Sequence, residues 1–243
     1  MRSLSTSQKN QFLMDLADAL TGQAANLINA NKEDLEHLEK KKGFSDAFYD
    51  RLLLTPARID DMSTGLRDIA ALEDPVGEVV KLWRRPNGLQ IGLQRVPIGV
   101  IGIIYEARPN VTIDAAGLAL KAGNAVILRG SSEAIHSNRA LVNIIQQVLA
   151  GHDLDKGAVS LIENTERAAV NDLIKAKDYL DLVIPRGGAS LINTVVENAT
   201  VPVIQTGEGN CHIYVDEYAD LEMALQALTS LKYIIFGSGQ TRP

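Results

Sequence analysis

The sequence has too little cysteine for a disulfide framework. Cys211 is the single cysteine among 243 residues, so no disulfide bond can form within the chain. The four histidines are scattered along the sequence, and with one cysteine they form no spacing that is typical of a zinc site. We therefore expect no bound metal.

Long apolar runs are also missing. No stretch approaches the roughly 20 uncharged apolar residues that a helix needs to cross a bilayer. Residues 1–10 contain no apolar core of the kind that a signal peptide carries. The expected location is therefore the cytoplasm, with no membrane partner.

The chain has no excess of positive charge. It contains 24 lysines and arginines against 30 aspartates and glutamates, a formal net charge of −6. General attraction to nucleic acid is therefore not expected, and a small anionic ligand would need a local group of cations. Hydrophobic residues make up 46% of the chain, which is enough for a sizeable core in one large domain.

The usual glycine fingerprint of dinucleotide-binding proteins, G-x-G-x-x-G, is absent. The nearest match, Gly99-Val-Ile-Gly102, falls inside a predicted strand and does not open a helix. The standard Rossmann pyrophosphate turn is therefore not supported, and a dinucleotide would have to bind in a different manner.

Residues 7–71 are predicted to be helical. Apolar residues recur there at three- and four-residue spacing, for example at Leu13, Leu16 and Leu20. The charged run 36–42 is interpreted as a solvated helix end. The chain is thus expected to begin with an all-helical segment.

A protruding β-hairpin is predicted within residues 76–97. Two alternating segments, 78–83 and 89–95, are joined by a turn that contains Asn87-Gly88. A two-stranded ribbon is marginal by itself and usually packs on something else. We expect this hairpin to contact a second copy of the chain in a homo-oligomer.

From Ile98 onward, apolar strands alternate with helices, which predicts an α/β fold with a parallel sheet covered on both faces. The expected strands are 98–104, 125–129, 158–162, 180–185, 201–205 and 212–215. The expected helices are 112–122, 132–150, 166–176, 189–199 and 220–233. Ligands of such sheets bind beyond the carboxyl ends of the strands.

Two strand-to-helix junctions in this sheet use the same device, an arginine followed by glycine and small residues. They are formed by Arg129, Gly130, Ser131 and Ser132, and by Arg186, Gly187 and Gly188. Backbone N–H groups at a helix start, beside a cation, can hold a phosphate. Glycine and serine are also ordinary turn and capping residues. The repetition of the device within one sheet favours a phosphorylated or dinucleotide ligand.

The segment 105–110, Tyr-Glu-Ala-Arg-Pro-Asn, follows the first strand of the sheet at the same edge. Asn110 could donate an amide N–H to an oxyanion, and Arg108 could bind a carboxylate or phosphate. The alternative is a proline turn in which the asparagine caps the next helix.

Cys211 is followed directly by His212 in a second glycine-rich segment, 205–212. A cysteine beside a histidine suggests a thiolate nucleophile, but adjacent residues of a strand point to opposite faces. The favoured interpretation is a buried structural cysteine.

Taken together, the segments 96–133, 182–188 and 201–216 closely resemble the gamma-glutamyl phosphate reductases, or glutamate-5-semialdehyde dehydrogenases, of the aldehyde dehydrogenase superfamily. The resemblance implies a Rossmann-like cofactor domain without the usual fingerprint, a catalytic domain and an oligomerisation ribbon. The hairpin 76–97 matches that ribbon.

The resemblance also implies the reaction, which is NADPH-dependent reduction of L-glutamyl 5-phosphate to L-glutamate 5-semialdehyde with release of phosphate. In that family a cysteine thiolate displaces the phosphate, and the resulting thioester is reduced by hydride. By position, the turn from Arg129 to Ser132 would bind the adenosine ribose and 2′-phosphate of NADP. Gly187 and Gly188, after Arg186, would bind the pyrophosphate, and Asn110 would donate to the oxyanion.

The sequence departs from the family pattern in two places. Many members carry glutamate at the position of Gln205, which a reductase does not need because it does not hydrolyse the thioester. In the family a Thr-Gln-Arg-Pro-Ser-x-Cys-Asn motif supplies the nucleophile, whereas here the segment 231–243 diverges and reaches only Thr-Arg-Pro. We therefore expect residues 1–243 to form an N-terminal cofactor-binding domain of a truncated enzyme, without the catalytic domain and inactive alone.

Two other functions remain open at this stage. The chain could be a non-catalytic nucleotide-binding or interaction remnant of a disrupted gene. A general aldehyde dehydrogenase is disfavoured by Gln205 and by the segment 105–110, which differs from the Trp-Asn-Phe-Pro type.

Overall fold

The computed structural model describes residues 1, 3–41, 43–205 and 213–230. The chain divides into two compact units, Met1–Thr206 and Gly207–Pro243. The described part of the second unit contains one helix, α9 (Leu221–Ser230). Its start is capped by the Asp220 carboxylate, which accepts hydrogen bonds from the backbone N–H groups of Glu222 and Met223 at 2.9 and 3.1 Å.

The first unit begins with the helical segment that the periodicity predicts. It comprises α1 (Thr6–Gly22), α2 (Ala24–Lys40), α3 (Asp46–Leu52) and α4 (Pro56–Ala71). Local chemistry explains two of the starts. Ser5 and Gln8 form a reciprocal capping box before α1, and Thr55 caps α4, where Pro56 stands in the first turn.

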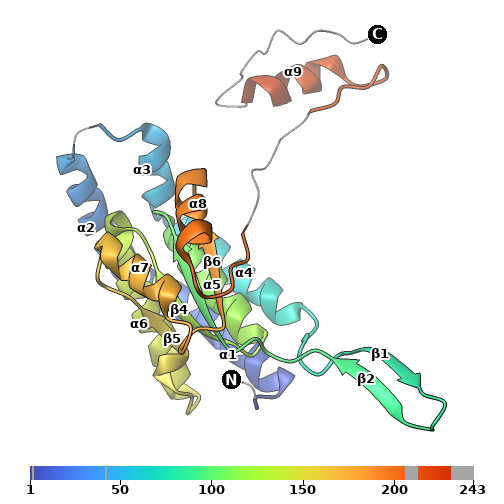
Figure 1. Cartoon of the computed structure of the whole chain (residues 1–243). Helices are drawn as coiled ribbons and strands as arrows, with labels where there is room; N and C mark the ends of the chain where they lie inside the picture. Colours follow the sequence, from blue (N-terminus) through green and yellow to red (C-terminus); the bar gives the residue numbers. More distant parts are fainter. Residues whose placement is uncertain (2, 42, 206–212, 231–243) are drawn as a thin grey trace. The chain divides into compact units, whose positions relative to one another are not determined.

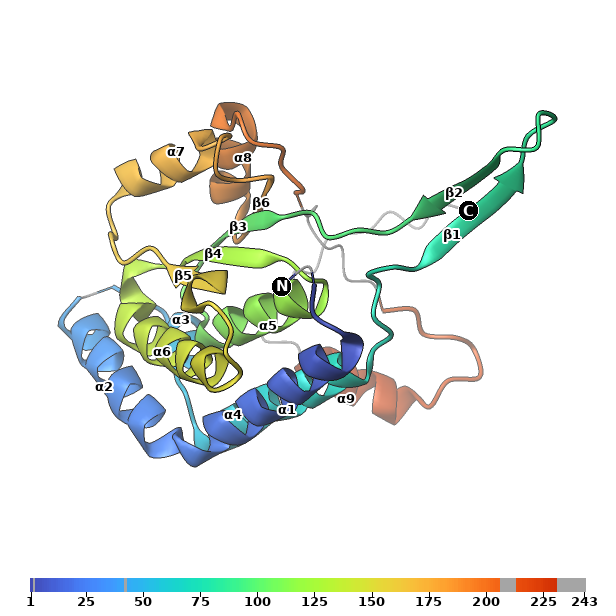
Figure 2. The same ribbon diagram turned by 90° about the horizontal axis from the view of Figure 1, so that it is seen from below.

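The rest of the unit is a four-stranded parallel sheet in the order β5-β4-β3-β6. Its strands are β3 (Val100–Tyr105), β4 (Ala125–Arg129), β5 (Val159–Leu161) and β6 (Leu182–Arg186). The helices between and after them are α5 (Pro109–Lys121), α6 (Ile135–Gly151), α7 (Arg167–Lys175) and α8 (Ala189–Asn198). In Figure 2, α5 and α6 cover one face of the sheet, and α7 and α8 cover the other. The predicted α/β fold with a parallel sheet is confirmed.

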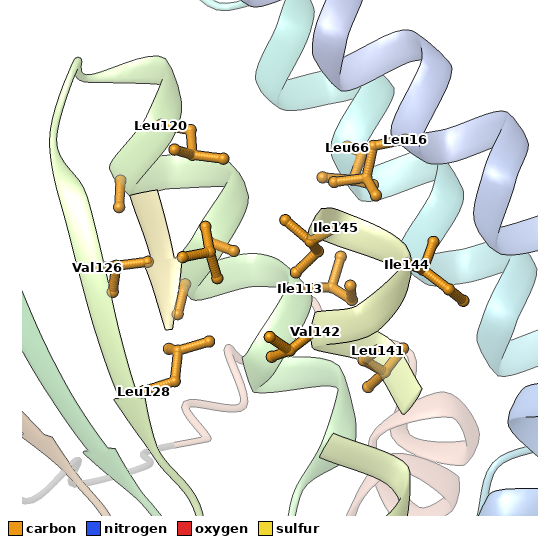
Figure 3. Packing of buried hydrophobic residues seen from close by; sticks show 14 of the residues in the cluster. Leu16, Leu66, Ile113, Leu120, Val126, Leu128, Leu141, Val142, Ile144 and Ile145 are labelled. Carbon is orange, nitrogen blue, oxygen red and sulfur yellow. The ribbon is translucent and has the colours of Figure 1, made fainter. Parts of the chain in front are cut away.

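The main hydrophobic core lies between the sheet and the helices α1, α4, α5 and α6. Figure 3 shows Val126 and Leu128 of the sheet facing Ile113 and Ile145. All four side chains are fully buried. A second cluster fills the opposite face, between β3, β6, α7 and α8. The sheet is therefore held rigidly from both sides, and its carboxyl edge is a fixed platform.

The predicted hairpin is present as β1 (Val79–Arg84) paired antiparallel with β2 (Gln90–Gln94). Gly88 has φ of +86°, a left-handed conformation that suits glycine in the Asn-Gly turn. The ribbon extends away from the sheet (Figure 1), and Leu82 and Leu93 are 64% and 57% exposed. Its contact with a second copy stays a prediction.

The structure corrects several expected boundaries. The strand expected at 201–205 is reduced to an isolated bridge between Val203 and Val183, because Pro202 has no N–H to continue the ladder. Residues 213–215 form no strand, since no other strand in the described ranges pairs with them. The helix expected at 132–150 starts with a separate 3₁₀ turn, η1 (Ser132–Ala134).

Candidate functional site

The strand register brings the predicted junctions to one edge of the sheet. Ile104 of β3 pairs with Arg129 at the end of β4, and Tyr105 pairs with Arg186 at the end of β6. The turn 106–110 leaves β3 between these two arginines. The three motifs from the sequence therefore flank the same carboxyl edge, where ligands of parallel sheets bind.

Arg129 is engaged by backbone carbonyl groups. Its Nη2 donates to the carbonyl of Thr165 at 2.7 Å, and its Nη1 donates to the carbonyl of Gly130 at 3.1 Å. The Nε atom is buried and has no partner in the described residues. Burial lowers the pKa of Arg129, and the nearby Glu133 carboxylate acts in the opposite direction. The guanidinium thus holds the loop after β5 and retains one unused donor.

Gly130 is required by internal packing. A Cβ at this position would overlap the amide nitrogen of Asn138 and lie 3.1 Å from two carbons of the Tyr105 ring. The Tyr105 hydroxyl is hydrogen-bonded to Thr112 Oγ1 at 2.7 Å, and Thr112 donates to Asn138 Oδ1 at 2.8 Å. Burial raises the pKa of Tyr105 to about 12, so the ring stays neutral and supports this turn.

Ser131 and Ser132 open the 3₁₀ turn before α6. Ser131 Oγ accepts from the backbone N–H of Glu133 at 3.3 Å and also hydrogen-bonds the Glu133 carboxylate. Burial acts to raise the pKa of Glu133, but hydrogen bonds from Ser131 and Lys41 lower it to about 2. The Glu133 carboxylate is therefore charged at neutral pH and lies beside Ser131 and the exposed Ser132.

The N-terminus of α6 is already occupied by a carboxylate of the chain itself. Asp34 of α2 accepts from the backbone N–H groups of His136 and Ser137 at 3.0 and 2.8 Å, and from Ser137 Oγ at 2.6 Å. Asp34 is 2% exposed. Burial raises its pKa, and these hydrogen bonds act to lower it. Asp34 therefore takes the place at this helix start that a ligand phosphate would otherwise occupy.

The N-terminus of α8 is exposed, although a carboxylate of the chain contacts it as well. Gly188 is its N-cap residue, and the backbone N–H of Gly188 donates to Glu106 Oε1 at 2.8 Å. A Cβ at Gly187 would lie 2.8 Å from the same oxygen. Arg186 is exposed, and its guanidinium makes no hydrogen bond or ion pair within the described ranges. This turn combines an accessible helix start with a free cation.

A cleft of about 350 Å³ opens at this turn, and we call it the arginine cleft. It is lined by Arg51, Arg108, Arg186, Glu106, Gly187 and Gly188, with Tyr105 and Val111. The lining thus contains three arginines and one glutamate, whose carboxylate accepts a hydrogen bond from a backbone N–H. The excess of positive charge makes this cleft the strongest candidate for an anionic ligand in the described chain.

Asn110 lies in a neighbouring cleft of about 440 Å³ between α3, α4 and α5, which shares Arg51 and Arg108 with the first. Its side-chain nitrogen donates to Asp114 Oδ2 at 3.3 Å. The alternative in which Asn110 caps α5 is wrong, because the N-cap is Arg108 and Pro109 occupies the first turn. Asn110 is therefore free of a capping role and exposed at the cleft.

The sheet brings Arg186, Gly187 and Gly188 together with Arg108, and it places the turn 129–132 at the adjacent strand. Asn110 lies one cleft away. The sequence motifs did not predict Glu106, Arg51 or Asp114 as site residues. Glu106 and Asp114 lie on either side of the Arg-Pro-Asn turn in the sequence, so that turn could have indicated both residues. Arg51 is distant from the turn in the sequence, and no motif indicates it. Cys211 and His212 fall outside the described residues, and Gln205 is exposed just before that segment.

The described residues contain no cluster of three or more potential metal ligands. In the same ranges, every helix is too short or too polar to cross a membrane.

A family comparison settles the relationship of the chain. The model of the aldehyde dehydrogenase family matches residues 1–241. This chain belongs to the aldehyde dehydrogenase family. A gamma-glutamyl phosphate reductase of Moorella thermoacetica is 59% identical over 232 residues, which cover 96% of this chain and 55% of the relative. One of Halothermothrix orenii is 54% identical over 243 residues, 100% of this chain and 56% of the relative.

Solved structures agree with this assignment. The crystal structure of gamma-glutamyl phosphate reductase from Thermotoga maritima has a TM-score of 0.85 and 46% sequence identity, covering 93% of this chain and 55% of that one. A probable aldehyde dehydrogenase of Listeria monocytogenes, at 18% identity, has a TM-score of 0.66 over 86% of this chain and 42% of that one, and shares the fold. The chain spans about half the length of the curated relatives it matches.

Proposed function

We propose that this chain forms the nicotinamide-binding part of a cytoplasmic reductase that converts L-glutamyl 5-phosphate to L-glutamate 5-semialdehyde and phosphate, a step of proline biosynthesis. The observation that carries the proposal is the arginine cleft at the start of α8, which is lined by Gly188 and by Arg186, whose guanidinium makes no hydrogen bond or ion pair within the described residues. The names of the close relatives support the choice of reaction.

The residues at α8 fit the pyrophosphate of a dinucleotide. Gly187 and Gly188 allow close backbone approach, and Arg186 supplies positive charge without an ion-pair partner in the described ranges. A bound NADPH would supply the hydride for the reduction. These residues of the chain would bind and orient it, and exclude water from the sheet edge.

The residues at the end of β4 fit the adenosine end less simply. Arg129 has one buried unused donor at Nε, which a ribose oxygen or a 2′-phosphate would satisfy. The charged Glu133 carboxylate nearby opposes a phosphate and favours hydroxyl groups. We propose that Arg129, Gly130, Ser131 and Ser132 bind the adenosine ribose, with Arg129 acting on the 2′-phosphate.

Asn110 is proposed as the oxyanion donor. Asn110 is exposed at the first turn of α5, and among the described residues its amide makes one long hydrogen bond, to Asp114. The amide nitrogen carries two N–H groups, so the one that does not point to Asp114 can donate to a substrate oxygen.

The nucleotide site is tested by calorimetric titration of the chain with NADPH. Arg186→Gln should weaken binding by about tenfold, since one charge-assisted contact to phosphate is lost. Arg85→Gln on the exposed hairpin is the matched control and should bind as the unmodified chain does. If NADPH binds equally well to both variants, the site at α8 is wrong, and if the unmodified chain binds no nucleotide, the proposed function fails.

We also infer that the 243 residues alone do not complete the reaction, because Cys211 is the only thiol of the chain and its setting favours a structural role. The test is an assay of semialdehyde oxidation with phosphate and NADP. No turnover is expected. Turnover that survives Cys211→Ala would contradict the need for a thiol, and turnover that Cys211→Ala abolishes would make Cys211 the nucleophile.

The hairpin is proposed as the surface of a homo-oligomer. Leu82 and Leu93 lie exposed on it, and such a ribbon gains stability by packing on another chain. Leu82→Lys should lower the mass measured by light scattering, whereas Lys81→Gln on the same strand should not. An unchanged mass in the Leu82 variant would exclude this surface.

A further inference from the structure

The second cleft, of about 440 Å³ between α3, α4 and α5, has an ionic pattern that the nucleotide does not explain. We call it the α3–α5 cleft. Arg58 and Asp50 on its wall are paired with each other at 2.9 Å, and Arg58 also donates to the carbonyl of Leu53 at 2.8 Å. The charges of Arg58 and Asp50 therefore compensate each other. The other charged side chains of the cleft need a separate explanation.

Two cations of the α3–α5 cleft have no partner. Arg51 at the end of α3 and Arg108 before α5 are both exposed, and neither guanidinium makes an ion pair or hydrogen bond with any residue in the described part of the chain. Two guanidinium groups lining one concave surface repel each other unless an anion lies between them. A carboxylate matches this arrangement because it accepts several N–H groups at once.

The same cleft also holds two carboxylates, Asp61 and Asp114, that make no ion pair with a described residue, and Asp114 is the more buried of them. Asp114 is half-buried, and within the described residues it accepts one hydrogen bond, the 3.3 Å bond from the neutral amide of Asn110. Burial raises the pKa of Asp114, and the bond from Asn110 acts to lower it. A half-buried acid of this kind is stabilised by a ligand that brings its own positive charge.

We propose that the α3–α5 cleft binds the zwitterionic end of an α-amino acid, with Arg51 and Arg108 on the α-carboxylate and Asp114 on the α-ammonium group. A simple anion would use the arginines and leave Asp114 repelling it, whereas an α-amino acid satisfies both signs. The inference rests on the proposed function, since L-glutamyl 5-phosphate carries such an end. Because Arg51 and Arg108 also line the arginine cleft, the amino-acid end would lie next to the proposed nucleotide site.

The test compares L-glutamate with glutarate, which is the same dicarboxylate without the ammonium group. Calorimetric titration of the unmodified chain should give a dissociation constant for L-glutamate at least about tenfold lower than for glutarate, the value of one charge pair. N-acetyl-L-glutamate, in which the positive charge is removed, should bind as weakly as glutarate. Equal binding of all three, or no binding of L-glutamate, overturns the proposal.

Variants of Arg108 and Asp114 test the carboxylate contact and the ammonium contact separately. Arg108→Gln should weaken L-glutamate and glutarate alike, by about tenfold, because both use the carboxylate contact. Asp114→Asn should weaken L-glutamate to the level of glutarate and leave glutarate unchanged or tighter. Arg85→Gln and Asp60→Asn, both exposed and outside this lining, are the controls. If Asp114→Asn weakens both ligands equally, Asp114 has a structural role only and the proposal is wrong.

NADPH titration of the same proteins separates this proposal from the proposed function. Asp114→Asn should leave NADPH binding unchanged. If the chain binds L-glutamate more tightly than glutarate but binds no nucleotide, the amino-acid site is supported and the proposed reductase function is excluded. If the chain binds NADPH but binds L-glutamate and glutarate equally, the proposed reductase function is supported and the amino-acid site is excluded. The ligand series on the unmodified chain decides the matter even if a variant does not fold.

Discussion

Glu106 and Gly188 are joined by a hydrogen bond in which the backbone N–H of Gly188 donates to Glu106 Oε1 at 2.8 Å. Glu106 follows β3 and Gly188 precedes α8, so the bond links two neighbouring strand ends across the arginine cleft. A carboxylate of the chain therefore occupies the donor that the proposed pyrophosphate would use. The two anions compete for the same helix start.

This competition predicts that Glu106→Gln tightens NADPH binding. Removal of the negative charge from the cleft should lower the dissociation constant by roughly threefold to tenfold, because like-charge repulsion with phosphate is lost. Calorimetric titration at two salt concentrations measures the effect, which should shrink at higher salt. Glu78→Gln on the hairpin is the control. Weaker binding in the Glu106 variant would mean that the carboxylate assists the ligand.

The packing around Gly130 predicts a large loss of stability in Gly130→Ala. The added methyl group would overlap the buried Asn138 amide and crowd the Tyr105 ring, and overpacking of this kind costs about 1–3 kcal/mol. Urea unfolding measures the change. Gly151→Ala, where nothing lies within 4 Å of the new Cβ, is the control. A stable Gly130 variant would show that the turn 129–132 moves freely.

The hydrogen bonds to Glu133 predict a pH-dependent contribution to stability. Its pKa is held at about 2, below the ordinary value of 4.5, so the folded state favours the charged form. The contribution is complete above about pH 5 and is lost as the pH falls through 2, by roughly 3 kcal/mol in all. The difference in unfolding free energy between the unmodified chain and Glu133→Gln should therefore shrink across that range. A difference that is constant with pH would contradict the shift.

The two charges at the end of β4 predict cofactor preference. Arg129→Ala should weaken NADPH more than NADH, and Glu133→Gln should strengthen NADPH relative to NADH, each by about threefold to tenfold. Parallel titrations with both nucleotides measure the ratios. Equal losses for NADPH and NADH in the Arg129 variant would remove the assignment of Arg129 to the 2′-phosphate.

Much of the fold follows from local patterns. The spacing of Leu13, Leu16 and Leu20 predicts α1, and Asn87-Gly88 predicts the hairpin turn. The apolar segments around β3, β4 and β6 predict the strands of the sheet. The prediction of a strand at 201–205 was wrong because Pro202, which has no backbone N–H, interrupts the hydrogen bonds to the neighbouring strand. Membership in the aldehyde dehydrogenase family also follows from the sequence, since the motifs that carry it are continuous segments.

The site depends on contacts that no local pattern contains. Asp34 caps α6 across about one hundred residues of sequence, and Arg129, which the sequence suggested for a ligand, is engaged by the carbonyl of Thr165. Arg51 joins Arg108 at the two clefts only because α3 packs near the start of α5.

The sequence by itself thus determined most of the elements, their order, the family and the edge of the sheet at which we propose that ligands bind. The tertiary structure alone decided which carboxylate contacts which helix start, Asp34 at α6 and Glu106 at α8, and which charges remain unpaired. The physical reason is that hydrophobic period and turn chemistry act between neighbours in the chain, whereas charges and helix ends interact through space after the core has packed.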